Sequence, residues 1–308
     1  MVMIKSTVKT FVALLAVTLA PVCAAEQAVL HRHTVMADGH PVALWEKSAD
    51  GATEAVLLVH GRTWSARPDF DLQVKGEALS LMDGLVDEGY AVFAVDLRGY
   101  GETPRDETGW LTPNRAADDV AIVVAWIAEA GDWRIKPHLF GWSMGSTISQ
   151  LAVQRHPEVA SSLTLFGYWR DDDMQLPPDE AGIEPEMATN TAEAAASDFI
   201  VPGAISQAAI DAYVAEALDT DPVRVDVRAM DEYNALDATQ IRIPTLIIAG
   251  ESDPLAQAEN LAKLFVRLGT GHKQYVSVPG GDHAAFLEKP RAYFIHELVG
   301  FFEGVTID

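Results

Sequence analysis

Residues 138–150 read HLFGWSMGSTISQ, and this stretch decides the fold. Its first residues, His138–Phe140, predict a short buried strand, and the stretch from Gly145 onward predicts a helix. Between them stands Gly141-Trp142-Ser143-Met144-Gly145, a Gly-x-Ser-x-Gly pattern that places a serine on a sharp turn from strand to helix. Both glycines are needed because a side chain at either position would collide with neighbouring backbone. Ser143 is then exposed at a helix N-terminus, where the helix dipole favours a developing negative charge.

On either side of this turn, short apolar runs alternate with longer amphipathic ones from residue 55 onward. Such alternation is typical of a mostly parallel sheet covered by helices on both faces, so we predict an α/β fold. Residues 29–46 alternate apolar and polar side chains, which predicts an antiparallel pair at one edge. The predicted strands are Ala55–Val59, Tyr90–Val95, His138–Phe140, Ser162–Phe166, Thr245–Ala249 and Gln274–Val278, and the predicted helices are Val74–Glu88, Pro113–Ala130, Gly145–Arg155, Pro254–Leu268 and Pro290–Glu303.

The length of 308 residues and the hydrophobic content of 49% suit one compact body with an insertion. Residues 170–238 break the alternation, because they carry 17 Asp or Glu and short helical pieces such as Ala208–Leu218. We therefore predict a core of residues 25–169 and 239–308, with residues 170–238 inserted as an acidic helical cap. The alternative is a disordered acidic loop. The apolar residues of this segment argue against disorder, because they need burial.

The first 24 residues differ from the rest of the chain. Lys5 and Lys9 precede the apolar run Phe11–Ala20, and Val22-Cys23-Ala24 offers a small-residue cleavage site, so we predict a signal peptide over residues 1–24. The apolar run is shorter than the ~20 residues of a membrane helix. We expect export to the periplasm or secretion, with a lipoprotein anchored at Cys23 as the alternative. Because Cys23 is the only cysteine, the mature chain would contain no disulfide.

The serine of the strand-to-helix turn requires a base, because a serine hydroxyl is a weak nucleophile at neutral pH. His283 follows the last predicted strand, on a loop that can bring its ring over the carboxyl ends of the strands. Asp253 also follows a predicted strand, and a carboxylate there would fix the tautomer of the histidine and stabilise its cation. Asp171–Asp173 and Asp282 are rival carboxylates, but Asp253 is expected at the same edge of the sheet as Ser143 and His283.

Five segments together resemble the successive signatures of the α/β-hydrolase superfamily. They are His60-Gly61, Asp96-Leu97-Arg98-Gly99-Tyr100-Gly101, Gly141 to Gly145, Gly250 to Asp253, and Gly281-Asp282-His283. The resemblance implies an eight-stranded, mostly parallel sheet, a helical cap after the sixth strand, and a catalytic triad of Ser143, Asp253 and His283. It implies no substrate, since this fold supports many chemistries.

Relatives of this type form an oxyanion hole from the backbone N–H after the nucleophile and another N–H after the His-Gly pair. In this sequence the two donors would be Met144 and Arg62, with Thr63 as the alternative for the second. His60 and the Asp96–Gly101 loop are expected to be structural. Haloalkane dehalogenases and epoxide hydrolases of this fold use an aspartate nucleophile, so Ser143 argues against those two activities.

We predict hydrolysis of a carboxylic ester or lactone through an acyl-enzyme. The segments Gly145-Ser146-Thr147 and His156-Pro157-Glu158 are also similar to proline iminopeptidases, so an exported aminopeptidase or amidase is the alternative. Against that alternative, Arg62-Thr63-Trp64 replaces the Gly-Pro-rich loop of those enzymes. A carbon–carbon bond hydrolase and a non-catalytic binding protein are further alternatives.

Trp142, Tyr168 and Trp169 lie near the predicted site and are expected to line a substrate pocket. The net charge of −23 argues against nucleic-acid and membrane-surface partners, and an acidic cap would disfavour anions, so we expect a neutral or cationic acyl substrate of small size. The mechanism requires no cofactor or metal, and nothing near His31-Arg32-His33 completes a ligand set. Activity should fall at acidic pH, because a general-base histidine must be neutral.

Overall fold

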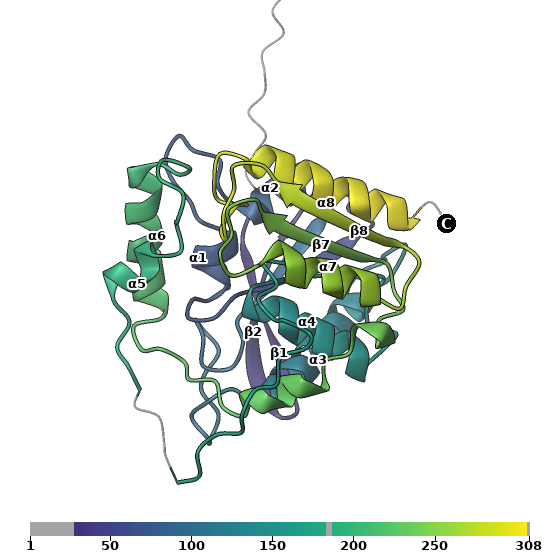
Figure 1. Cartoon of the computed structure of the whole chain (residues 1–308). Helices are drawn as coiled ribbons and strands as arrows, with labels where there is room; N and C mark the ends of the chain where they lie inside the picture. The colour runs from purple at the N-terminus through teal and green to yellow at the C-terminus, as the bar shows by residue number, and fades with distance from the viewer. Residues whose placement is uncertain (1–27, 183–186, 307–308) are drawn as a thin grey trace, which may run out of the picture.

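The computed structural model describes residues 28–182 and 187–306, which form an eight-stranded sheet in the order β1-β2-β4-β3-β5-β6-β7-β8 (Figure 1). β1 pairs with β2 and β2 with β4 in antiparallel fashion, and the remaining pairs are parallel. The predicted signal peptide, residues 1–24, lies outside the described residues. The strands are β1 (His31–Ala37), β2 (His40–Ser48), β3 (Ala55–Val59), β4 (Ala91–Val95), β5 (His138–Trp142), β6 (Ser162–Phe166), β7 (Thr245–Gly250) and β8 (Lys273–Val278).

Helices cover both faces of this sheet. The strands bury alternate residues on opposite faces, as Leu57 and Leu58 do in β3, and so separate two apolar cores. One core is closed by α3 (Pro113–Ala130), α4 (Met144–Arg155) and α7 (Ala258–Arg267), and the other by α1 (Ala66–Phe70), α2 (Leu81–Asp87) and α8 (Arg291–Thr306). The predicted α/β architecture is therefore confirmed, including the antiparallel pair at one edge.

Two helices begin later than predicted. The helix expected over Val74–Glu88 starts at Leu81, because Ser80 caps it by accepting a hydrogen bond from the Asp83 backbone N–H at 2.9 Å. The helix expected from Pro254 starts at Ala258. The residues before it form a turn in which the backbone N–H groups of Leu255 and Ala256 donate to the side chain of Asp253. The short helix α1 is not predicted from the sequence.

The segment between β6 and β7 contains α5 (Ala192–Ala196), α6 (Gln207–Thr220) and the 3₁₀ turns η1 (Met230–Ala235) and η2 (Ala238–Gln240). Every fourth residue of α6, Ala209, Tyr213 and Ala217, is buried, and α6 packs against α1. Asp221, at the end of α6, accepts hydrogen bonds from the backbone N–H groups of Ser65 and Gly101 at 2.8 and 2.9 Å. The insertion is thus fastened to loops of the core near the carboxyl ends of the strands.

Within the two described stretches, no helix combines the length and the apolar character needed to cross a membrane.

Candidate active site

Ser143 occupies a strained turn at the carboxyl end of β5. Its backbone has φ 55° and ψ −117°, a left-handed conformation that is costly for any residue other than glycine. Of the described residues 138–153, Ser143 alone is not buried. Its backbone N–H donates to the carbonyl oxygen of Phe166 at the end of β6, at 2.9 Å. The turn therefore presents the serine hydroxyl beyond the edge of the sheet, at the N-terminus of α4.

The glycines on either side of Ser143 are required by contact with backbone. A Cβ at Gly141 would lie 2.2 Å from the carbonyl oxygen of Gly145, and a Cβ at Gly145 would lie 2.2 Å from the carbonyl oxygen of Val59. Neither oxygen can move, because both belong to packed backbone. The steric reason predicted from the sequence for both glycines therefore holds.

His283 and Asp253 are in direct contact. The imidazole Nδ1 lies 2.8 Å from Oδ2 of Asp253, and both residues are buried. The other carboxylate oxygen of Asp253 accepts the backbone N–H groups of Leu255 and Ala256, at 2.8 and 3.2 Å. Because the carboxylate can only accept, Nδ1 carries the proton and Nε2 is left free to take one.

The backbone of Phe166 and Gly167 contacts Ser143 on one side and His283 on the other, whereas no hydrogen bond joins the Ser143 hydroxyl to the His283 ring among the described residues. Phe166 binds the backbone of Ser143, and a Cβ at Gly167 would lie 2.9 Å from Cε1 of His283 and 3.4 Å from Oδ2 of Asp253. In addition, the Trp142 indole donates to the carbonyl oxygen of His283 at 2.7 Å. Gly167, which has φ +59°, is a site residue that the sequence analysis missed; the only sequence signal is a glycine directly after a strand.

The His60–Thr63 loop lies against the serine. A Cβ at Gly61 would lie 3.3 Å from the Cβ of Ser143. The backbone N–H of Thr63 donates to the Tyr100 hydroxyl at 3.4 Å, whereas those of Arg62 and Met144 have no partner among the described residues. This favours Arg62 over Thr63 as the second oxyanion donor. Thr63 also has φ 93°, a strained value for a β-branched residue.

His60 braces this loop, as expected. Its Nε2 accepts the backbone N–H of Leu97 at 3.1 Å, so Nδ1 carries the proton and donates to the carbonyl oxygen of Gly61 at 2.8 Å. Burial lowers the pKa of His60 to about 4. The ring is therefore neutral at physiological pH, and both of its nitrogens are used by backbone.

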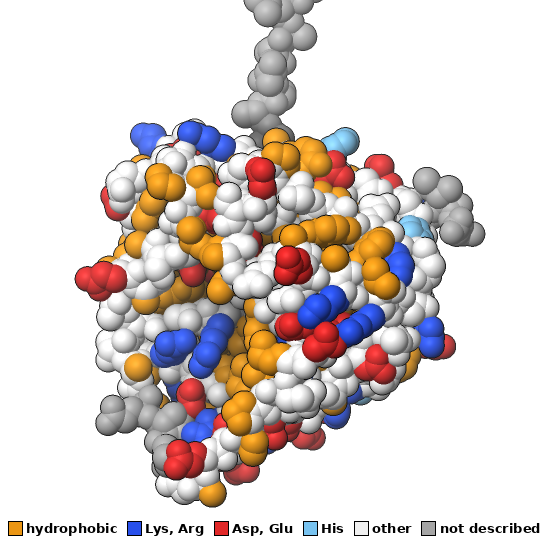
Figure 2. All heavy atoms as spheres, viewed as in Figure 1, with side chains coloured by type: hydrophobic (Ala, Val, Ile, Leu, Met, Phe, Trp, Pro, Cys, Tyr) orange, Lys and Arg blue, Asp and Glu red, His pale blue; other side chains and the backbone are white. Residues whose placement is uncertain are grey.

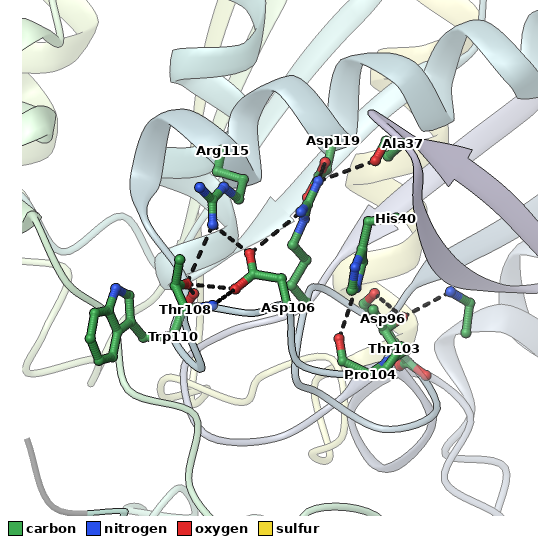
Figure 3. A network of polar contacts seen from close by, with 12 residues as sticks. Ala37, His40, Asp96, Thr103, Pro104, Asp106, Thr108, Trp110, Arg115 and Asp119 are labelled. Carbon is green, nitrogen blue, oxygen red and sulfur yellow. Dashed lines mark hydrogen bonds and ion pairs between the residues drawn. The ribbon is translucent and has the colours of Figure 1, made fainter.

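The Asp96–Gly101 loop is held by a buried polar network (Figure 3). Arg98 forms a two-pronged ion pair with Asp119 of α3, at 2.6 and 2.7 Å, and also contacts Asp106. Asp96 accepts the backbone N–H of Ala66 at 3.0 Å, and burial raises its pKa to about 6. These contacts give the loop the structural role that the sequence suggested.

The rival carboxylates have other partners. Asp171 and Asp173 form ion pairs with Lys263. Asp282 is fully buried, accepts the backbone N–H groups of residues 200, 201 and 284, and interacts with the side chain of Glu288. Neither set contacts the ring of His283, so Asp253 is the carboxylate bound to that ring.

Two of the three expected pocket residues are buried. Trp142 and Tyr168 expose almost no surface, and their packing is that of core side chains. Trp169 is partly exposed and packs edge-on against Tyr233. Substrate contact stays a prediction for Trp169. Trp142 instead donates a hydrogen bond from its indole N–H to the carbonyl oxygen of His283.

An acidic pair, Asp69 of the core and Asp198 of the insertion, was also missed by the sequence analysis, and Asp198 interacts with His283. The Tyr213 hydroxyl contacts Asp69 at 2.9 Å and Asp198 at 3.3 Å. Burial raises the pKa of Asp198 to about 6, although the nearby His283 opposes the shift. Burial and the Asp198 charge hold the pKa of Asp69 well above its usual range, and its Oδ2 has no hydrogen-bond partner among the described residues.

The molecular surface is hollowed on the side to which the strands β7 and β8 point. Figure 2 shows a hollow lined by hydrophobic side chains and bordered by basic ones, in the region between the insertion and the core.

Among the described residues, no three His, Cys, Asp or Glu side chains are arranged to hold a metal ion.

Sequence comparison matches residues 51–290 to the family described as serine aminopeptidase, S33. A comparison with curated proteins finds no match.

Solved structures share the fold at low identity. A hydrolase from Pseudomonas aeruginosa is 18% identical and has a TM-score of 0.66, over 88% of this chain and 98% of its own. The esterase RhEst1 from a Rhodococcus species is 19% identical with a TM-score of 0.64, over 90% and 99% of the two chains. An esterase from Thermogutta terrifontis is 19% identical with a TM-score of 0.62, over 89% and 99%. At these identities the likeness establishes the α/β-hydrolase fold.

Proposed function

The chain belongs to the serine aminopeptidase S33 family of α/β-hydrolases, and on that premise we propose that it cleaves a carboxylic ester or lactone through an acyl-enzyme. The proposed nucleophile is Ser143, the proposed general base is His283, and Asp253 is proposed to orient the histidine. The contact that supports this best is the 2.8 Å hydrogen bond between His283 and Asp253, at the sheet edge where the strained turn exposes Ser143.

In the proposed reaction, Oγ of Ser143 attacks the acyl carbon and its proton passes to Nε2 of His283. Asp253 stabilises the imidazolium through the proton on Nδ1. The backbone N–H groups of Met144 and Arg62 bind the oxyanion; such a donor typically contributes ~3 to 4 kcal/mol to the transition state. The imidazolium then protonates the leaving oxygen, and a water deprotonated by His283 releases the acid.

The first experiment is covalent labelling with a fluorophosphonate. We expect one label, on Ser143, and none on Ser143→Ala or on heat-unfolded protein. A label on another residue, or full esterase activity in Ser143→Ala, would disprove the assignment.

An aminopeptidase is the second candidate, and the interaction of Asp198 with His283 is the observation that favours it. Asp198 is partly buried and lies close enough to His283 for their charges to interact. Asp69 contacts the same tyrosine hydroxyl but is fully buried. An ammonium group is the chemistry that a charged carboxylate binds, so Asp198 supports the expectation of a neutral or cationic substrate. We propose that the insertion is a cap that holds Asp198 over the site.

A substrate panel separates the two candidates. Aryl esters and lactones should react faster than proline and alanine arylamides if the first proposal is right. In Asp198→Asn, KM for amine-bearing substrates should rise at least ~10-fold while neutral esters are unaffected. Asp211→Asn, which removes an exposed acid of α6, is the matched control. Strong arylamidase activity that depends on Asp198 would reverse the order of the candidates.

A further inference from the structure

Asp282 joins the loop of His283 to the insertion. Its Oδ2 accepts the backbone N–H groups of both Ile200 and Val201, each at 2.6 Å, and its Oδ1 accepts that of Ala284 at 2.9 Å. The side chain is fully buried. Hydrogen bonds from N–H groups to a buried carboxylate are short and strong, so this contact fixes the backbone of the insertion directly beside His283.

A second contact joins the same two segments on the other side of His283. The backbone N–H of Lys289 donates to the carbonyl oxygen of Ala204 at 2.8 Å. Residues 197–206 connect α5 to α6 and include Asp198, so the same contacts hold the segment that carries Asp198. The loop 282–289 and the insertion therefore move as one unit while both contacts persist.

Glu288 lies behind Asp282 and has one oxygen without a donor. Its Oε2 accepts the backbone N–H of Asp282 at 2.9 Å, and its buried Oε1 has no hydrogen-bond partner among the described residues. Burial and the neighbouring Asp282 carboxylate raise the pKa of Glu288 to about 8. Near neutral pH Glu288 therefore keeps a proton, and its interaction with the Asp282 side chain is one cause of that raised pKa.

Other charges face this pair from each packed segment. Asp253, after β7, also raises the pKa of Glu288, and Asp198, after α5, interacts with both Asp282 and His283. Two of these three neighbours, Asp253 and Asp198, are acids, so a second negative charge on the pair would be opposed by both, and His283 is the one of the three that can compensate it. Loss of the proton from Glu288 thus places two negative charges side by side in a buried site, where they repel each other.

We propose that Asp282 is a positioning residue for the reaction: it fastens residues 200–201 to the loop of His283, and Glu288 supports it as an uncharged acid. This inference rests on His283 being the general base proposed above. The position of the base, and of the segment that carries Asp198, then depends on Glu288 keeping its proton.

The proposal predicts an alkaline loss of activity. With a pKa of about 8, only about one tenth of Glu288 keeps its proton at pH 9, so kcat of the wild type should fall to about a tenth between pH 7 and pH 9. Glu288→Gln keeps an uncharged donor in the same place, and its kcat should stay level over that range. Glu251→Gln removes an exposed carboxylate that accepts the backbone N–H of Gly280 in the same loop, and should retain the wild-type profile.

Amide hydrogen exchange at Ile200 and Val201, whose N–H groups donate to Asp282, gives a readout independent of catalysis. Asp282→Asn places an NH₂ group or a weaker acceptor opposite Ile200 and Val201, so exchange at residues 200–201 should rise at least ~10-fold and kcat should fall about 10-fold with little change in KM. If Asp282→Asn does not fold, Glu288→Gln decides alone. An unchanged alkaline loss in Glu288→Gln, or unchanged exchange in a folded Asp282→Asn, overturns the inference. Failure of the proposed function would instead appear as missing label on Ser143.

Discussion

Gly167→Ala tests whether the backbone after β6 sets the position of the proposed base. The new methyl group would lie 2.9 Å from Cε1 of His283, about 0.5 Å closer than the 3.4 Å at which ordinary contacts begin. Since a misplacement of ~1 Å can lower a rate ~100-fold, a shift of half that size should lower kcat about 10-fold. The backbone at φ +59° adds a cost of roughly 1–2 kcal/mol for any residue with a Cβ.

The two effects are separated by a control glycine. Gly51 has φ +73° and no atom within 4 Å of its Cβ position, so Gly51→Ala carries the backbone cost without the clash. Both variants should lose similar free energy of unfolding in guanidinium titrations. Only Gly167→Ala should lose kcat on an aryl ester. If Gly167→Ala keeps kcat within twofold of the wild type while it loses the same stability as the control, the contact with His283 does not matter for the reaction.

Three further substitutions probe the site and its support. Asp253→Asn should lower kcat by about 10³- to 10⁴-fold with KM nearly unchanged, because it favours the wrong tautomer of His283; a loss below tenfold in steady-state assays would contradict the role of the aspartate. Arg98→Met leaves the buried Asp119 without its ion pair and should reduce the free energy of unfolding by ~3–5 kcal/mol, whereas a stability equal to the wild type in denaturant titration would show that the network is dispensable. Trp142→Phe removes the indole N–H that donates to the His283 carbonyl, so stability should fall by about 1 kcal/mol and the ester kcat severalfold; unchanged values of both would refute the bracing role.

The fold was predictable because its signals are local. Apolar runs such as Ala55–Val59 are buried on both faces, and the alternation of such runs with amphipathic helices leaves few arrangements other than a parallel sheet. The serine turn was predictable for a similar reason. A side chain at Gly141 or Gly145 would clash with nearby backbone, and every sharp turn of this kind makes the same close contacts. Helix starts were less predictable, because side chains such as Ser80 and Asp253 select where the first turn begins.

The missed residues depend on contacts between distant parts of the chain. A glycine is needed at position 167 because the His283 ring packs against its backbone. The sequence around Gly167 does not indicate that His283 will be its neighbour. Asp198 is one of 17 acidic residues in the insertion, and only the fold distinguishes the one that lies beside His283. Conversely, the signal peptide and the export that it implies stay predictions, which N-terminal sequencing of the mature protein would check.

The choice between ester and amide substrates cannot come from the proposed triad itself. Attack by the serine and binding of the oxyanion are the same for both, and they differ in the leaving group, which must be protonated by His283 before an amine can depart. Asp198 interacts electrostatically with that histidine and can also bind a substrate amine, so it acts on the step in which the two reactions differ. Because its pKa is about 6, the negative charge that would bind an ammonium group is present at neutral pH and is lost as the pH falls below that value. An amine-bearing substrate should therefore show a KM that rises below pH 6 in the wild type and is independent of pH in Asp198→Asn, whereas a neutral ester should show no such difference in KM between the two proteins.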